Sequence, residues 1–102
     1  MRFQTKKSQL DSIVLLLGEL VKRNQPEDIA QKLVHSIVKK VYLRLLVKTE
    51  TATRSGFTFT LSDPDALALF VFINQVDLMI EFYPCESNEI QMISNQIHQA
   101  YV

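Results

Sequence analysis

Side chains that could act as nucleophiles or metal ligands are few and far apart in this sequence. It contains one cysteine, Cys85, and two histidines, His35 and His98. A cysteine nucleophile needs a base beside it, so Cys85 with either histidine is the conceivable pair. No histidine or acid stands at one of the familiar metal-ligand spacings. We therefore predict no catalytic residue, no metal site and no cofactor.

Two carboxylates near the middle of the chain resemble an acid–base pair. Asp63 and Asp65 are close enough in sequence to act together. They flank Pro64 directly after Ser62, however, and this order is typical of a helix start: a capping oxygen, a first-turn proline and acids near the positive end of the helix dipole. The two glycines are too isolated to form a phosphate-binding loop. The sequence thus favours a non-enzymatic protein.

The strongest candidate for a functional surface lies between residues 39 and 48. Apolar residues alternate with others from Val41 to Lys48, which predicts a β-strand with one buried face. The predicted outward face and the two lysines before it form the candidate interaction surface: Lys39, Lys40, Tyr42, Arg44, Leu46 and Lys48. A tyrosine between basic residues can stack a base while the cations hold phosphates. Nucleic-acid binding by Tyr42, Arg44 and Lys48 is therefore the alternative function.

Association with a protein fits the same surface better. A two-stranded sheet is marginally stable alone and has open edges, which a second chain would cover. Tyr42 and Leu46 are the apolar groups of the outward face. We predict a protein-interaction or regulatory module that forms a homodimer through at least one of them, or that binds another protein. No apolar run is long enough to predict binding to a membrane.

Positive charge stops halfway along the chain. The net charge is zero, but residues 1–54 hold all 11 Lys and Arg and only five acids, a net charge of +6. Residues 55–102 hold six acids and no Lys or Arg, a net charge of −6. Such asymmetry indicates a charged partner, or two halves that fold against each other and cancel their fields.

The N-terminal third predicts two helices. Apolar residues recur every three or four positions from Leu10 to Val21 and again from Ile29 to Val38. The expected buried face of the second helix is Ile29, Ala30, Leu33, Val34, Ile37 and Val38. Pro26 prevents the first helix from continuing, and the connection to the second helix is very short. We therefore expect an antiparallel helical hairpin.

The strand at residues 41–48 is expected to pair with a second strand at residues 57–61, after a turn over residues 49–56. The expected buried face holds Val41, Leu43, Leu45 and Val47 from the first strand and Phe59 from the second. In that register Val47 lies opposite Phe59 and Leu45 opposite Leu61. The apolar residues from Ala66 to Tyr83 then favour a helix, with two further strands as the alternative. The apolar stripe of that helix is Leu69, Phe72, Ile73, Val76, Met79, Ile80 and Tyr83. A C-terminal helix follows Pro84, with Ile90, Ile93 and Ile97 on its buried face. The final order is α-α-β-β-α-α, or αα-ββββ-α in the alternative.

The length of 102 residues predicts a single domain over residues 1–102, of the small α+β class. The basic N-terminus lacks a cleavage site and a long enough apolar run for a secretory signal. A lone cysteine cannot form an internal disulfide, so nothing indicates an oxidising compartment. We expect a cytoplasmic protein.

Overall fold

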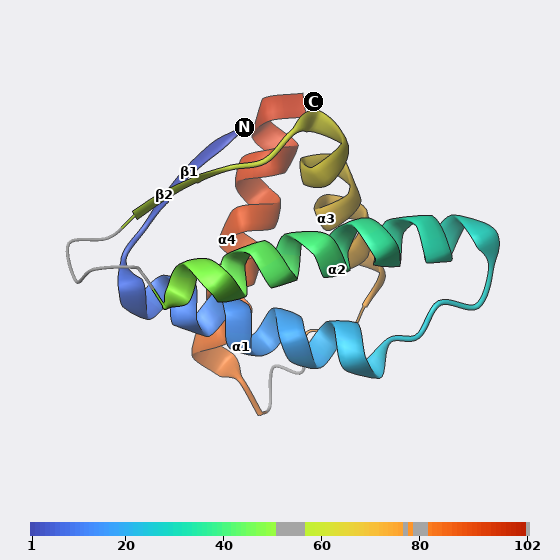
Figure 1. Ribbon diagram of the computed structural model, residues 1–102, viewed down its shortest axis with the longest axis horizontal. Helices are drawn as coiled ribbons and strands as arrows, with labels where there is room; N and C mark the ends of the chain where they lie inside the picture. The colour runs from blue at the N-terminus through green and yellow to red at the C-terminus, as the bar shows by residue number, and fades with distance from the viewer. Residues whose placement is uncertain (51–56, 77, 79–81, 102) are drawn as a thin grey trace.

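Four helices and a two-stranded sheet form the described part of the protein (Figure 1). The computed structural model describes residues 1–50, 57–76, 78 and 82–101. In chain order the elements are β1 (Arg2–Thr5), α1 (Lys7–Arg23), α2 (Ile29–Thr49), β2 (Phe57–Thr60), α3 (Asp63–Gln75) and α4 (Pro84–Tyr101). The predicted α+β class with a two-stranded antiparallel sheet is confirmed. The predicted turn lies mostly outside the described residues.

The strand predicted for residues 41–48 is wrong, because α2 continues without a break to Thr49. The residues of α2 that are buried are Val38, Val41 and Leu45. Their spacing of three and four residues is helical. Leu43 and Val47, expected on the same buried strand face, are 48% and 64% exposed. The alternating apolar residues therefore belong to two faces of one helix, a buried face with Val41 and Leu45 and an exposed face with Leu43 and Val47.

The first strand of the sheet is at the N-terminus instead. β1 pairs antiparallel with β2, and Phe3 is the register partner of Phe59. The two rings stack with their centroids 5.0 Å apart, and both are buried. The predicted pairing of Phe59 with Val47 is therefore wrong, although the predicted burial of Phe59 is confirmed. Two helices connect the paired strands along the chain.

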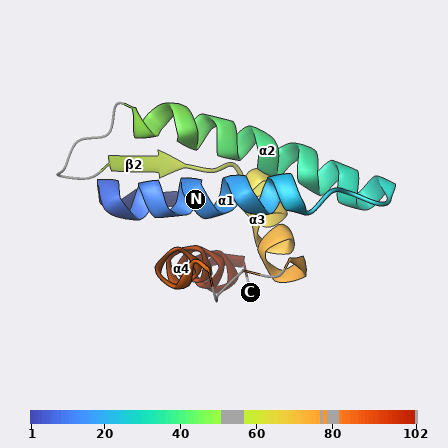
Figure 2. The ribbon, with the colours of Figure 1, turned by 90° about the horizontal axis from the view of Figure 1, so that it is seen from below.

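The predicted antiparallel helical hairpin is confirmed in α1 and α2, which lie side by side with opposite chain directions (Figure 1). The Asp28 side chain caps α2 by accepting a hydrogen bond from the backbone N–H of Gln31 at 2.7 Å. In Figures 1 and 2 the first turns of α2 extend past the end of α1. This end of α2 therefore has few neighbours.

The helix expected after the second strand forms, so the alternative of two strands from residue 66 is wrong. The Ser62 hydroxyl accepts a hydrogen bond from the backbone N–H of Asp65, as the capping pattern predicts. The predicted apolar stripe is buried at Leu69, Phe72 and Ile73. The helix ends at Gln75, so the predicted continuation to Tyr83 is wrong at Val76, Leu78, Phe82 and Tyr83, while residues 79 and 80 lie outside the described residues.

The hydrophobic core lies between α2 on one side of the molecule and α4 on the other. Figure 2 shows α2 along one side and α4 along the other, with α1 and β2 between them. α1 contacts both α2 and α4, and it contributes the largest group of buried side chains: Leu10, Ile13, Val14, Leu16, Leu17, Leu20 and Val21. The predicted buried face of the C-terminal helix is confirmed at Ile90, Ile93 and Ile97. The side of α2 that faces away from α1 and α3 therefore forms the outer surface of the molecule.

Candidate functional site

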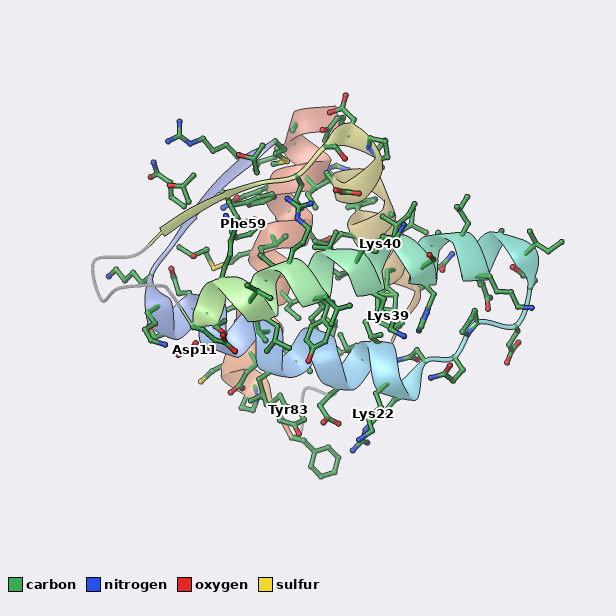
Figure 3. The ribbon with its side chains drawn as sticks, in the orientation of Figure 1. Asp11, Lys22, Lys39, Lys40, Phe59 and Tyr83 are labelled. Carbon is green, nitrogen blue, oxygen red and sulfur yellow. The ribbon has the colours of Figure 1, made fainter. Side chains whose placement is uncertain are left out.

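The helical conformation of α2 divides the six residues of the predicted interaction surface between two sides. Neighbours two positions apart, such as Tyr42 and Arg44, point about 160° apart on a helix. Lys39, Tyr42 and Leu46 lie on the side toward α1, where they line shallow grooves. Lys40, Arg44 and Lys48 follow one another at four-residue spacing on another side. Figure 3 shows Lys39 and Lys40 on opposite sides of the α2 ribbon.

Tyr42 lies against α1 and is half-buried. Its ring crosses Gly18, where an added Cβ would come within 2.9 Å of the ring carbon and the hydroxyl oxygen. The adjoining groove has a volume of about 450 Å³ and is bordered by Leu15 and Leu46. Because the ring covers the α1 backbone, Tyr42 is not presented for stacking on a nucleic-acid base.

Arg44 joins α2 to the end of β2 and to the first turn of α3. Its guanidinium donates to the Asp65 carboxylate at 3.1 Å and to the carbonyl oxygen of Thr60 at 3.2 Å. This ion pair links the basic half of the chain to the acidic half. The Arg44 side chain is about half exposed, so the pair contributes little stability on its own. The positive charge of Arg44 is thus partly neutralised within the fold.

The outward side of α2 carries four exposed apolar side chains, which we name the α2 stripe. Its members and their exposed fractions are Ile29 (86%), Leu33 (63%), Leu43 (48%) and Val47 (64%). These positions and residues 36 and 40 follow a four-three alternation, so all of them fall within about 80° around the helix. The stripe extends for about 27 Å at the helical rise per residue. Such a row differs from the single exposed apolar residues that are normal on protein surfaces.

Positive charge surrounds the α2 stripe. The sequence of α2 contains Lys32, Lys39, Lys40, Arg44 and Lys48 but no Asp or Glu. The exposed Lys40 lies within the row of apolar residues, and the exposed Lys32 and Lys39 lie along one flank. Among the described residues neither Lys32 nor Lys40 forms a salt bridge. The outward side of α2 is therefore both apolar and strongly basic.

Part of this surface was missed because Ile29 and Leu33 were predicted to be buried. That prediction is wrong: their side of α2 faces solvent, whereas Val38 is buried. The sequence did contain a signal, because α2 has apolar residues on every side. A helix of that kind can bury more than one face. Periodicity alone does not tell which face the rest of the chain covers.

The groups with nucleophilic or ligand chemistry remain scattered. Cys85 and His98 lie near opposite ends of α4, about 20 Å apart at the helical rise per residue, so they cannot act as a pair. The imidazole Nε2 of His35 is 3.0 Å from the carbonyl oxygen of Val21, a contact within the helical hairpin. Within the described residues, no three His, Cys, Asp or Glu side chains could hold a metal ion. No described helix is long and apolar enough to cross a membrane.

One titratable contact connects the two C-terminal helices. The Tyr101 hydroxyl, near the end of α4, donates a hydrogen bond to the Asp63 carboxylate at the start of α3. This hydrogen bond raises the pKa of Tyr101 above its usual value of 10.0, with smaller effects from burial and from the negative charge of Asp63. The contact links the end of α4 to the start of α3 and lies on elements other than α2.

Comparisons with known proteins add no relative. No family model matches the sequence, no curated protein is similar to it, and no solved structure matches its fold. The candidate site therefore depends on the geometry of this chain alone.

Proposed function

We propose that this protein is a non-enzymatic, cytoplasmic interaction module that binds another protein through the α2 stripe. The observation that supports this most is the exposure of Ile29, Leu33, Leu43 and Val47 in one row on a helix whose opposite side is buried. Exposed apolar side chains gathered on one side of a helix mark interaction sites more often than scattered ones do. In this row the exposed Ser36 and Lys40 separate the pair Ile29 and Leu33 from the pair Leu43 and Val47. A second helix lying along the stripe would cover all four side chains at once.

Nucleic-acid binding, the alternative from the sequence, is less well supported. Its predicted face required Tyr42, Arg44 and Lys48 to point the same way, but α2 places Tyr42 on a different side from Arg44 and Lys48. Tyr42 covers Gly18, and Arg44 is engaged by Asp65. A phosphate backbone laid along the outer side of α2 would meet the apolar residues of the stripe. We expect weak or no binding of duplex or single-stranded DNA and RNA at about 150 mM salt.

The predicted homodimer through Tyr42 or Leu46 remains a prediction, but α2 offers it little support. The sheet edge that was to be covered does not include these residues. Two α2 helices packed against each other would bring ten Lys and Arg together without a facing acid from either helix. Like charges at such an interface are unfavourable. We therefore propose another protein as the partner.

Photo-crosslinking tests the proposed function. A benzophenone amino acid replaces Leu43 on the stripe or the exposed Gln99 on α4, in cells that produce the chain. We expect a discrete protein adduct from position 43 and none from position 99. The adduct is identified, and the purified partner is tested for binding to the full chain. No adduct specific to position 43, or an adduct that consists of nucleic acid, would contradict the proposed function.

A further inference from the structure

The charges around the α2 stripe indicate which partner would fit it. We infer that the stripe binds an acidic amphipathic helix of another protein, an inference that rests on the proposed function. The helix would place its apolar residues against Ile29, Leu33, Leu43 and Val47. Its Asp and Glu side chains would flank the apolar row and face the cations of α2. The chemistry of the partner is thus apolar along one line and anionic beside it.

Helical geometry supports a helix as the occupant. The four-three alternation from residue 29 through 33, 36, 40 and 43 to 47 is the spacing of the contact line between two packed helices. The stripe is straight and about 27 Å long, so a partner helix of similar length could contact all of it. Among the described helices and strands, no other element lies over this side of α2 in Figures 1 and 2.

Charge complementarity selects an acidic helix. α2 offers Lys32, Lys39 and Lys40 without a single acid of its own, whereas Arg44 is already paired with Asp65. Lys40 lies inside the apolar row, so a covering helix would bury its ammonium group. That burial is unfavourable unless a carboxylate of the partner pairs with the ammonium group. Glu or Asp opposite Lys40 would therefore fix the register of the partner, and further acids opposite Lys32 and Lys39 would steer its approach.

The same features disfavour the other occupants. A second copy would have to supply an acidic helix, yet α2 has no acid, and the exposed side of α4 carries few charges. An anionic membrane would place the Lys40 ammonium among acyl chains, and the stripe has no Trp, Tyr or Phe to anchor at the lipid interface. Nucleic acid would leave the four apolar side chains unmatched.

A synthetic peptide tests the inference with the full chain. The peptide has 21 residues, the length of α2, with Leu at the two contact positions of each heptad and Glu beside them. Two control peptides have the same sequence with Lys for Glu, or the same composition in scrambled order. Fluorescence anisotropy of the labelled peptides measures each affinity at about 50, 150 and 500 mM salt.

We expect the acidic amphipathic peptide to bind with a Kd on the order of 10 μM, and the control peptides at least about tenfold more weakly. Raising the salt should weaken this binding several-fold but not abolish it, because apolar contacts remain. Leu33→Ser with Val47→Ser should remove binding. Leu67→Ser, at an exposed leucine on α3, is the matched control and should not change it. Circular dichroism should show the same helix content in all variants.

Several results would overturn the inference. These are equal binding of the acidic and basic peptides, binding that survives Leu33→Ser with Val47→Ser, and no binding at about 100 μM. Tighter binding to duplex DNA or to vesicles of one-third anionic phospholipid would assign the face to those ligands. Sedimentation that shows a dimer lost on Leu33→Ser would assign it to a second copy. A crosslinked partner from position 43 combined with no binding of the acidic peptide would retain the interaction module and reject the acidic helix.

Discussion

Gly18 and Tyr42 illustrate how single residues set the packing of the helical hairpin. The Tyr42 ring occupies the space beside Gly18 that any larger residue would need. Glycine is a poor residue inside a helix, by about 1 kcal/mol relative to alanine. Its presence in α1 is explained by the ring that crosses it, because the ring brings α2 close to the α1 backbone.

We predict that Gly18→Ala lowers the free energy of unfolding by about 1–3 kcal/mol, the usual effect of overpacking. In a Tyr42→Ala background the same change should raise it by up to about 1 kcal/mol, because the added methyl group then has room and alanine favours the helix. Urea unfolding of the four proteins in this double-mutant cycle measures both effects. The same sign in both backgrounds would show that the ring does not determine the need for Gly18.

The stacked pair in the sheet supports a second prediction at this scale. Phe59 is 3% exposed, stacks on Phe3 and borders the same small hollow of the core as Ile13 and Leu45. Phe59→Ala should lower the free energy of unfolding by ~3–5 kcal/mol. Thr58, the half-buried neighbour on the other face of β2, is the control, and Thr58→Ala should have a much smaller effect. Urea melts in which the two variants lose equal stability would contradict this assignment of faces.

At the scale of elements, α2 decides both the fold and the candidate site. The second half of the α2 sequence fits both the helical period and the two-residue period of a strand, because exposed apolar residues stand between the buried ones. The helix prevails because it already extends from Ile29, no glycine or proline interrupts it, and adding residues to an existing helix is favourable once it is nucleated. Two of the four apolar residues that resemble a strand face, Leu43 and Val47, also belong to the α2 stripe.

The helix separates Leu45 from Leu43, which a strand would have placed on one face. Leu45 is 2% exposed and Leu43 is 48% exposed. Leu45→Ala should therefore lower the free energy of unfolding by about 2–5 kcal/mol, and Leu43→Ala by less than about 1 kcal/mol. Chemical denaturation of both variants measures the difference. Comparable losses would favour the strand that the alternation suggested.

The contact between α3 and α4 should respond to alkaline pH. Tyr101 donates to Asp63, and its pKa is raised above 10.0, so the folded state favours the neutral phenol. A raised pKa means that this contribution to stability is complete below pH 10 and is lost as the pH rises through the folded-state pKa. Thermal melts at increasing pH should show an alkaline loss of stability that Tyr101→Phe reduces. An identical alkaline loss in Tyr101→Phe would contradict the role of this hydrogen bond.

Much of this fold follows from local sequence signals. Helical spacing and the Ser62 cap predict α1, α4 and the starts of α2 and α3 correctly, whereas α3 ends at Gln75 and not at the predicted Tyr83. β1 was missed because four residues with one apolar side chain, Phe3, carry almost no strand signal; its pairing with β2 comes from distant parts of the chain. The candidate site could be located only in part. Lys39 to Lys48 were chosen from the sequence, but which side of α2 stays exposed depends on where α1 and α3 pack.

At the scale of the whole molecule, the basic and acidic halves of the sequence become different sides of the fold. The basic half includes α1 and α2, and the acidic half includes α3 and α4. The Arg44–Asp65 pair joins them, but the outward side of α2 keeps positive charge away from that contact. The molecule therefore presents cations and apolar groups together on one outer side. This combination supports a protein partner whose charge is opposite and whose contact surface is apolar.

Methyl-detected NMR of the full chain, titrated with the acidic amphipathic peptide, tests the central claim most directly. We predict that the largest shift changes occur at the methyl groups of Ile29, Leu33, Leu43 and Val47. The exposed Leu67 on α3 and the exposed Met92 on α4 should stay unchanged as internal controls. Largest changes at Leu15 and Leu46, in the groove between α1 and α2, or no changes on α2 at all, would contradict the claim that the α2 stripe is the binding surface.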